Sequence, residues 1–435
     1  MKHFSIITLG CKVNQCESAA IAHLLEKAGH LRLQSSSSPD IVIINTCTVT
    51  GKAAMQSRQA IRRTVRNFPR ATLVVTGCYA QTAVEEIKAI EGVDLIVAHQ
   101  DKMRIHEMIA GKAFEHSAIE PYRHKSQRCT FKMLPPFTDF KRTRAFLKIQ
   151  DGCNTRCTYC IVPYARGSSC SMSESEVYHH IKALGREGYA EVVLTGIHLG
   201  AYGIDLSPSS SLNVLLKTLT TPPIVSRIRL SSIEPTEVND SLIDLIHTSQ
   251  GSICRHFHIP LQHGDDTILG RMGRPYTRHQ FAQVIHRIHA KIPQAAIGVD
   301  VMAGFPGETQ EAFSNTYQLI ADLPVTYLHV FPFSPRKGTP AADFKPKVPE
   351  RITKERCRDL RELGEKKRKA FYHTLIGQKV NLLVETHRKG VAKGLSDNYV
   401  PIELMGANVP KNSVVTVRID RIEAGNVVIG VLNEP

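Results

Sequence analysis

Three cysteines stand close together near the middle of the chain, at Cys153, Cys157 and Cys160 in the run DGCNTRCTYC. The spacing Cys-x3-Cys-x2-Cys supplies three thiolates, which can hold three irons of a [4Fe–4S] cube and leave the fourth iron open for a ligand. A structural zinc site needs a fourth ligand, which His198 or a distant cysteine could supply. The spacing therefore favours an iron–sulfur centre that performs chemistry, with a zinc site as the alternative.

Three further cysteines each end a short apolar run in the N-terminal part of the chain. The runs SIITLGC, IVIINTC and TLVVTGC end at Cys11, Cys47 and Cys78, and a helix-like stretch follows each run. Such runs predict buried parallel strands in βα units. Functional residues gather beyond the carboxyl ends of such strands, so these thiols should converge and could hold a second cluster. The alternative is that the three are buried cysteines without a shared role. Cys16, in the helix that follows Cys11, is expected to have no metal role.

Six strand-like runs separated by helical stretches occupy the middle of the chain. They are AFLKIQ, EVVLTGI, RIRLSSI, HFHIPLQ, AIGVDVMAGFP and YLHVFPF. Six strand–helix units predict a full or partial α/β barrel, of a (β/α)6 type, whose active site lies at the carboxyl ends of the strands. The first run leads directly into the Cys153 triplet. Later runs end at four residues that are predicted to line the same mouth, namely Gly196, Glu234, Gln262 and Gly304.

The last segment of the chain alternates short apolar runs with turn signals such as Gly425-Asn426. This pattern predicts a small all-β barrel of about five strands. Small barrels of this kind often bind single-stranded or loop RNA, and Tyr399 could stack on a base, although it is equally a candidate core residue.

The predicted α/β organisation is an N-terminal open parallel-sheet domain at 1–121, a basic linker at 122–141, a barrel with its following helix at 142–370, and the β-barrel at 371–435.

The chain is basic, with a formal net charge of +15 at neutral pH. Arg58, Arg62 and Arg66 recur every four residues, which places them along one face of a predicted helix. A basic balance with such a stripe favours a polyanionic partner, with a nucleic acid first and an anionic membrane as the alternative. No apolar run approaches the ~20 residues of a membrane span, and the N-terminal MKHFSIITLG does not resemble a signal peptide. A cytoplasmic location is therefore expected, where the eleven cysteines would stay reduced.

The chain resembles the radical S-adenosylmethionine methylthiotransferases along essentially its whole length. The Cys153 triplet is similar to their radical-generating cluster motif, and TLGCKVNQCES, NTCTVT and TGCYAQ are similar to their second-cluster domain. The C-terminal segment resembles a TRAM domain. The stretches KIQDGCN, RLSSIEP and FPFSPRKGTPAA resemble the branch that acts on N6-threonylcarbamoyladenosine in tRNA. The branches that act on N6-isopentenyladenosine in tRNA or on a ribosomal-protein aspartate are the alternatives.

The resemblance implies two [4Fe–4S] clusters, S-adenosylmethionine and a tRNA anticodon stem-loop modified at position 37. The Cys153 cluster would cleave S-adenosylmethionine to a radical that removes the hydrogen at C2 of the adenine. The cluster at Cys11, Cys47 and Cys78 would supply the sulfur. Tyr159, between two ligands of the triplet, would contact S-adenosylmethionine together with the four strand-end residues. The electron donor and the sulfur source are not identified by the sequence.

The chain departs from the family after Arg166-Gly167, where it carries Ser168, Ser169 and Cys170 and family members usually carry arginine at one or more positions. Loss of that charge places any substrate contact there in doubt, and Cys170 is expected to be a packing residue. A non-catalytic alternative is a redox-sensing iron–sulfur protein that binds RNA. Such a protein would bind iron and RNA but would not cleave S-adenosylmethionine.

Overall fold

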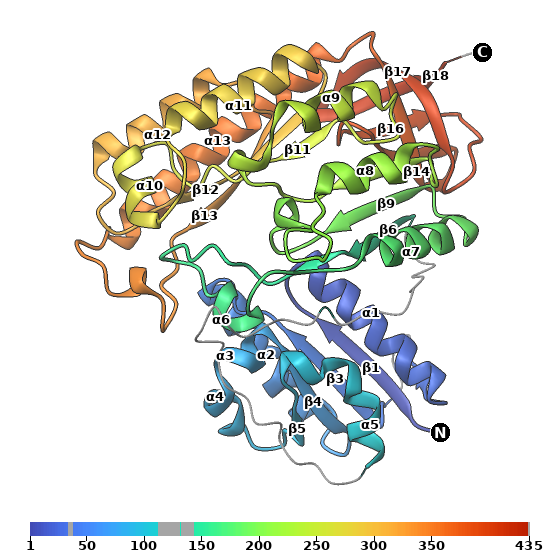
Figure 1. Cartoon of the computed structure of the whole chain (residues 1–435), viewed down its shortest axis with the longest axis vertical. Helices are drawn as coiled ribbons and strands as arrows, with labels where there is room; N and C mark the ends of the chain where they lie inside the picture. The colour runs from blue at the N-terminus through green and yellow to red at the C-terminus, as the bar shows by residue number, and fades with distance from the viewer. Residues whose placement is uncertain (34–37, 112–130, 132–142, 434–435) are drawn as a thin grey trace. The chain divides into compact units, whose positions relative to one another are not determined.

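A computed structural model describes residues 1–33, 38–111, 131 and 143–433 of the chain (Figure 1). Contacts divide it into two compact units. The first comprises the described residues of Met1–Asp139, Gln150–Met172 and Ser334–Ala342, and the second those of Phe140–Ile149, Ser173–Phe333 and Asp343–Pro435. The predicted domain boundaries follow the chain linearly and stay predictions. The predicted basic linker at 122–141 lies outside the described residues, apart from position 131.

The first unit is built on a five-stranded sheet of order β2-β1-β3-β4-β5, in which every pair is parallel. The central strand is buried throughout, and its residues alternate between two cores. Ile41 and Ile43 pack on one side of the sheet, and Val42 and Ile44 on the other. This arrangement confirms the open parallel sheet. The strands are β1 (His3–Thr8), β2 (Leu31–Arg32), β3 (Ile41–Thr46), β4 (Thr72–Gly77) and β5 (Leu95–Ile96).

Helices of the first unit lie between these strands or follow the last of them, and they cover both faces of the sheet (Figure 1). Residues of α1 and α5 join the core that contains Ile41, and residues of α2, α3 and α4 join the core that contains Val42. The central strands β3 and β4 are thus buried on both faces, as their continuous apolar runs predicted, whereas β1 and β2 toward the edge are more exposed. The helices are α1 (Lys12–Lys27), α2 (Gly51–Asn67), α3 (Cys78–Thr82), α4 (Val84–Lys88), η1 (His99–Arg104) and α5 (Ile105–Ala110).

Two distant segments complete the first unit. Residues Gln150–Met172 carry α6 (Val162–Arg166), which packs against α3, and a short antiparallel pair of β7 (Gln150–Asp151) with β8 (Cys170–Ser171). Residues Ser334–Ala342 are tied in by hydrogen bonds. The Gly51 amide donates to Ser334 Oγ at 2.7 Å, and the Ala341 amide donates to the Thr158 carbonyl at 2.9 Å.

The second unit contains the predicted six central strands, arranged as two parallel three-stranded sheets of order β10-β9-β6 and β11-β12-β13. An isolated parallel bridge joins Ile228 of β10, an edge strand of the first sheet, to Ile253, which precedes β11 of the other sheet. The strands thus form two arcs and not one continuously hydrogen-bonded barrel. They are β6 (Arg144–Lys148), β9 (Glu191–Thr195), β10 (Arg227–Leu230), β11 (His256–His258), β12 (Ala296–Ala303) and β13 (Tyr327–Pro332).

Helices lie between successive strands of the second unit, and α13 packs against β13 and β12. Most begin at a side-chain cap, which supplies an acceptor for a free amide of the first turn. Ser173 and Thr277 form complete capping boxes with the third residue of their helices. The α-helices are α7 (Glu174–Arg186), α8 (Leu212–Thr220), α9 (Asp240–Thr248), α10 (Asp266–Met272), α11 (Arg278–Lys291), α12 (Gln310–Asp322) and α13 (Glu350–Thr374), and short 3-10 turns are η2 (Leu199–Ala201), η3 (Pro235–Glu237) and, in the first unit, η4 (Pro340–Ala342).

The C-terminal segment is a closed five-stranded barrel of order β14-β15-β16-β18-β17, as its turn spacing predicted. Its core is aliphatic and includes Leu382, Ile402 and Val417. No helix in the described part of the chain is long and apolar enough to cross a membrane. The barrel elements are β14 (Lys379–Arg388), β15 (Val391–Ser396), β16 (Pro401–Met405), β17 (Val414–Glu423), η5 (Ala424–Asn426) and β18 (Val427–Leu432).

A buried ionic group, the barrel-side hub, fixes this barrel to the β10-β9-β6 sheet. It consists of Glu191, Arg227 and Arg229, all at most 1% exposed. Both guanidinium groups pair with the Glu191 carboxylate, at 2.6 and 2.8 Å. Their remaining N–H groups donate to backbone carbonyls of the barrel at Asn381, Leu395, Ser396 and Asp397. These bonds satisfy the buried cations.

Candidate functional site

The first three predicted ligands lie at the carboxyl ends of adjacent strands. Cys11 follows β1 at the N-cap position of α1, Cys47 follows β3 directly, and Cys78 follows β4 as the first residue of α3. Because β1, β3 and β4 are neighbours in one parallel sheet, their ends lie at one edge of it. The prediction that the three thiols share one sheet edge is therefore confirmed. Cys16 is a buried residue of α1, as expected.

The chain approaches itself closely at this edge. Gly10 has a positive φ of +96°, and a Cβ placed on it would lie 2.8 Å from both Cβ and Sγ of Cys47. Only glycine lets the Cys11 loop pass so near the Cys47 thiol. The Asn14 side chain adds a second tie, because it donates to the Leu9 carbonyl at 2.7 Å and to the Thr46 carbonyl at 3.0 Å.

Burial raises the pKa of Cys47 to about 11, and the nearby thiols of Cys78 and Cys11 raise it further. Burial likewise raises the pKa of Cys78, whereas the cations of Arg166 and Lys102 oppose that rise. Three thiols that repel one another as thiolates, with cations set beside them, form a donor set suited to a cationic iron–sulfur core. The residues at this edge therefore fit the cluster that the sequence predicted.

The second set of ligands lies on the loop between β7 and α6, also within the first unit. The Cys160 amide donates to the Cys157 carbonyl at 3.0 Å, and the Cys153 amide donates to the Gly167 carbonyl at 3.1 Å. Cys157 is buried, while Cys153 and Cys160 are partly accessible. Tyr159 stands between two of them and is partly exposed. Three thiols on one short closed loop fit three irons of a cube.

The unusual residues at 168–170 close this loop. Gly152 has a φ of +68°, and a Cβ on it would lie 2.0 Å from the Ser168 carbonyl oxygen. Ser169 accepts a hydrogen bond from the Gln150 side chain at 2.9 Å, and its amide donates to Asn154 at 3.1 Å. Cys170 is 2% exposed and pairs with Asp151 in the β7–β8 ladder. This placement agrees with a packing role for Cys170.

A buried polar group, the cysteine-side hub, joins the two cysteine loops. It comprises Asn14, Glu17, Lys102, Asp151 and Arg166, each at most 3% exposed. Arg166 Nη1 lies 3.0 Å from Glu17 Oε1 and 2.9 Å from Asp151 Oδ1, and Nη2 lies 2.6 Å from Asn14 Oδ1. Lys102 Nζ lies 2.5 Å from Glu17 Oε2. Because α3 begins at Cys78 and packs on α6, which ends at Arg166, the hub links the segments that carry the two sets of thiols.

The four residues predicted at strand ends of the second unit lie where the sequence placed them. Gly196 follows β9, Glu234 follows β10, Gln262 follows β11 and Gly304 follows β12. Glu234 is ion-paired with Arg274, and burial raises its pKa. A Cβ on Gly304 would lie 2.3 Å from Thr353 Oγ1, so this glycine permits the close approach of α13. Contact of these residues with S-adenosylmethionine stays a prediction.

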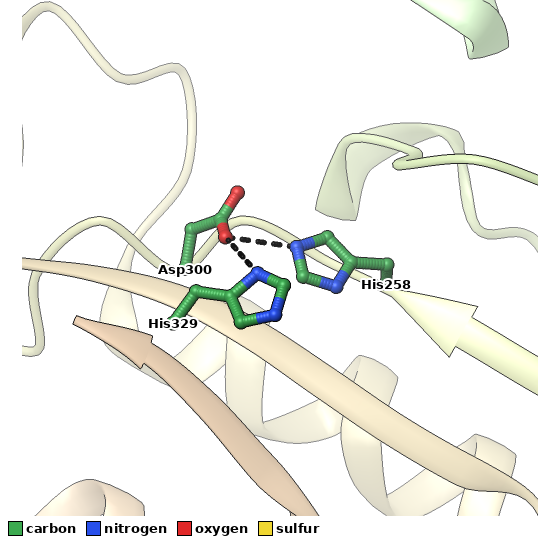
Figure 2. A group of neighbouring side chains, drawn as sticks. All are labelled: His258, Asp300 and His329. Carbon is green, nitrogen blue, oxygen red and sulfur yellow. Dashed lines mark hydrogen bonds and ion pairs between the residues drawn. The ribbon is translucent and has the colours of Figure 1, made fainter. Parts of the chain in front are cut away.

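A row of polar and aromatic side chains, which the sequence did not assign, crosses the β11-β12-β13 sheet. The end of the row is a group of three, the His–Asp–His group, formed by His258, Asp300 and His329 (Figure 2). His258 Nε2 lies 2.9 Å from Asp300 Oδ1, and His329 Nδ1 lies 3.3 Å from the same oxygen. Although burial acts in the opposite direction, these hydrogen bonds hold the pKa of Asp300 well below its usual range.

The predicted RNA-binding residues have different surroundings. Arg62 and Arg66 are exposed on α2, whereas Arg58 donates to Tyr79 Oη and Glu86 at 3.2 Å. The Tyr399 ring is stacked on His256, with centroids 4.3 Å apart, and has further contacts with Tyr327 and Arg229. Tyr399 thus has packing partners within the second unit. The RNA roles of all four residues stay predictions.

A cavity of about 890 Å³ lies in the first unit beside Cys47. Its wall carries three cations and two aromatic rings together with the Glu85 and Glu86 carboxylates. One of the cations, Arg336, also donates to Thr48 Oγ1 at 2.6 Å, next to Cys47 in the chain. Cations for phosphates and rings for bases suit a nucleic-acid ligand. These residues are Arg58, Arg336 and Lys337 with Tyr79 and Tyr164.

Sequence reasoning missed both the cysteine-side hub and the His–Asp–His group. A signal for the second was present, because His256-x-His258 and Tyr327-x-His329 place polar residues at alternate positions of predicted strands, on one face of the sheet. No comparable signal marks the hub. Its members come from four segments between positions 14 and 166, and only the fold brings them together.

Comparison with known proteins adds independent findings. Residues 3–98 match the model of "Uncharacterized protein family UPF0004", and residues 147–320 match the Radical SAM superfamily. The Bacillus subtilis "Threonylcarbamoyladenosine tRNA methylthiotransferase MtaB" is 39% identical over 95% of this chain and 92% of its own length. A "tRNA-2-methylthio-N(6)-dimethylallyladenosine synthase" from Pelotomaculum thermopropionicum is 34% identical over 88% of this chain and 87% of its own.

The solved structures support the fold. A radical S-adenosylmethionine methyltransferase, TsrM, from Kitasatospora setae aligns with a TM-score of 0.57 at 16% identity, over 79% of this chain and 77% of that chain. At this identity the likeness concerns the arrangement of helices and strands alone.

Proposed function

Because the chain belongs to the MtaB-type radical S-adenosylmethionine methylthiotransferases, we propose that it methylthiolates N6-threonylcarbamoyladenosine at C2 in tRNA. The product is 2-methylthio-N6-threonylcarbamoyladenosine. The proposal is carried by one observation: two sets of three thiols lie in one compact unit and are joined by a buried hub.

Iron–sulfur clusters and S-adenosylmethionine, once bound, supply the radical and the sulfur for this reaction. Cys153, Cys157 and Cys160 would hold the radical-generating cluster, and Cys11, Cys47 and Cys78 the sulfur-donating cluster. The target C–H is aromatic and not acidic, so the reaction needs no general base from the chain. The chain must instead position the two cysteine loops and supply charge near them. Arg166 does both, because its guanidinium bonds to residues of both loop segments and is itself a fixed cation.

Within the tRNA, the part that we propose the protein binds is the anticodon stem-loop, with the modified adenosine at position 37. The cavity beside Cys47 supports it, because Arg336 and Lys337 offer phosphate contacts while Tyr79 and Tyr164 offer stacking surfaces. The exposed Arg62 and Arg66 extend the basic surface along α2. A tRNA substrate also supports a cytoplasmic location.

Two cysteine variants test the division of labour between the clusters. Cys153→Ala should abolish formation of 5′-deoxyadenosine under anaerobic reducing conditions. Cys47→Ala should retain 5′-deoxyadenosine formation and lose the methylthiolated nucleoside. Cys16→Ala, which removes a buried thiol of the same unit, is the matched control and should retain both activities. Retention of 5′-deoxyadenosine by Cys153→Ala would overturn the radical assignment.

Mass spectrometry of tRNA nucleosides from cells with and without the protein tests the substrate. We expect loss of 2-methylthio-N6-threonylcarbamoyladenosine and accumulation of its precursor without the methylthio group. Loss of the isopentenyl counterpart instead would transfer the chain to the other tRNA branch. An unchanged nucleoside profile, with iron still bound to the protein, would favour a non-catalytic RNA-binding role.

A further inference from the structure

The β11-β12-β13 sheet presents two chemically different faces. On one face Val299 and Leu328 are among the residues directed to the helices, and Leu328 contacts Gly364 of α13. The alternate positions carry the His–Asp–His group on the opposite face. There the His329 side chain is 51% exposed, and Phe331, two residues further along β13, is 42% exposed. This face is therefore open at the carboxyl end of β13 and not filled by core packing.

The hydrogen bonds on the open face have a fixed direction. Asp300 is ionised and can only accept, so His258 Nε2 and His329 Nδ1 both carry the protons that they donate to it. With the Nε2 proton of His258 directed at Asp300, its Nδ1 faces the Tyr327 hydroxyl, 3.0 Å away, and can accept a hydrogen bond from it. The Tyr327 oxygen in turn accepts from His256 Nε2 at 2.8 Å. Burial raises the pKa of Tyr327 well above its usual value, which keeps the hydroxyl protonated.

This direction argues against a metal ion at the group. The three atoms that would have to coordinate a cation lie within 4.8 Å of one another. However, both imidazoles point N–H groups at Asp300 Oδ1, whereas a metal needs lone pairs directed at one common point. Asp300 Oδ1 already accepts hydrogen bonds from both histidines, so these atoms need no metal ion to satisfy them.

Two polar atoms are left for a ligand. Within the ranges that the structure describes, neither Asp300 Oδ2 nor His329 Nε2 has a hydrogen-bond partner. Figure 2 shows both hydrogen bonds reaching one oxygen of Asp300, while the other oxygen points away from both rings. The free oxygen can accept a hydrogen bond from an N–H or O–H group of a ligand. The free imidazole nitrogen accepts a hydrogen bond when neutral and donates one to an anion when protonated.

We propose that the His–Asp–His group binds the polar substituent on N6 of the target adenosine, an assignment that rests on the proposed function. A threonylcarbamoyl chain offers urea N–H groups and a hydroxyl to Asp300 Oδ2, and a carboxylate or hydroxyl to His329 Nε2. Its donors and acceptors thus match the two atoms that are left. Tyr327 and His256 hold His258, and through it Asp300, in one orientation.

The same group would select against an isopentenyl substituent. That chain is a hydrocarbon, so placing it here would remove water from Asp300 and His329 without replacing the hydrogen bonds. Sites built to hydrogen-bond a substrate reject analogues that lack the matching group far more strongly than apolar pockets discriminate by size. The His–Asp–His group is therefore a specificity-determining site, separate from the cysteines that would carry the clusters.

The test uses reconstituted holoenzyme and anticodon stem-loop RNAs that carry threonylcarbamoyladenosine, isopentenyladenosine or plain adenosine. For His329→Leu we expect at least a roughly tenfold loss of methylthiolation on the threonylcarbamoyl RNA. His329→Gln, whose amide can also donate and accept, should stay within about threefold of wild type. His286→Leu, at an exposed histidine on α11, is the matched control and should be unchanged.

Two readouts besides turnover separate the explanations. The dissociation constant of the threonylcarbamoyl RNA, measured without S-adenosylmethionine, should rise for His329→Leu, whereas that of the plain-adenosine RNA should not change. The 5′-deoxyadenosine formed without RNA should equal that of wild type. If it falls with His329→Leu, the group serves S-adenosylmethionine and the proposal is wrong. If His329→Leu acts like wild type on the threonylcarbamoyl RNA, the proposal is equally wrong.

Failure of the proposed function has a different signature. In that case wild-type holoenzyme itself would not methylthiolate the threonylcarbamoyl RNA, whatever the variants do. Activity of wild type on the isopentenyl RNA alone would overturn both the proposed function and the assignment of the His–Asp–His group.

Discussion

The cysteine-side hub and the barrel-side hub are both buried and both centred on arginine, yet they differ in what surrounds the charges. In the first, Arg166 and Lys102 balance Glu17 and Asp151, and the cations also act on nearby thiols. In the second, Arg227 and Arg229 share the Glu191 carboxylate, and backbone carbonyls of the C-terminal barrel take up their remaining donors. A buried ion group whose donors are taken up by backbone fixes structure, whereas one that lies beside the predicted cluster ligands can also tune their chemistry.

The largest effect should come from Arg166→Met. This change leaves the Glu17 and Asp151 carboxylates buried with less compensation, and we expect a cost of roughly 3–5 kcal/mol in the free energy of unfolding of the first unit. Iron content after anaerobic reconstitution should fall, because the cation beside the thiols is lost. Arg70→Met, at an exposed arginine of the same unit, is the control. Unchanged iron content together with unchanged stability would end the distinction between the hubs.

A smaller effect should follow Arg229→Met. Arg227 still pairs with Glu191 at 2.6 Å, so the cost is the loss of one guanidinium and of its bonds to the Ser396 and Asp397 carbonyls. We expect roughly 2–3 kcal/mol and faster hydrogen exchange in β14 and β15, with normal iron content. Loss of iron from this variant would show that the barrel-side hub is not purely structural.

The hubs should also differ in their response to pH. Burial lowers the pKa of His99, which contacts Asp151 at 3.2 Å, below 6.5, so its contribution to stability is present above 6.5 and is lost as the pH falls. In the other hub, the two arginines outweigh burial and lower the pKa of Glu191 to about 2, so its contribution is lost only below about 4.5. Unfolding of the apoprotein between pH 7 and 5.5 should be less pH-dependent in His99→Asn than in wild type.

The smallest effect concerns a thiol beside the barrel-side hub. Burial raises the pKa of Cys254 to about 12, which keeps it protonated and unreactive. Cys254→Ala should cost about 1 kcal/mol and leave iron content and methylthiolation unchanged. Loss of either would show that proximity to a buried arginine is enough to recruit a thiol into the chemistry.

The sequence predicted the parts of this molecule that repeat a local pattern. The apolar runs ending at Cys11, Cys47 and Cys78 became adjacent parallel strands, because continuous Ile, Val and Leu favour a sheet covered on both faces. The five-stranded C-terminal barrel followed from short runs and turn residues. The short β2, β7 and β8 were not predicted, since two-residue strands carry no periodicity.

The functional sites were predicted only where a motif names them. The six cysteines could be found by spacing and by their place after strands. Arg166 could not, because its partners Asn14 and Glu17 lie about 150 positions away in the chain. The His–Asp–His group could be predicted in part. Its alternation was visible in the sequence, but pairing of β11, β12 and β13 in one register was needed to bring its members together.

The discontinuous make-up of the first unit has a consequence for how the protein is assembled on the ribosome. The loop after β3, through Thr48, and the Cys153 loop, through Thr158, are each hydrogen-bonded to the segment Ser334–Ala342. Domains generally fold as units during synthesis, in order from the N-terminus. Here the N-terminal sheet emerges early, but its unit is complete only after position 342 of 435 has been translated. Iron–sulfur delivery to the completed unit, with this last segment in place, is therefore a late event in the maturation of this chain.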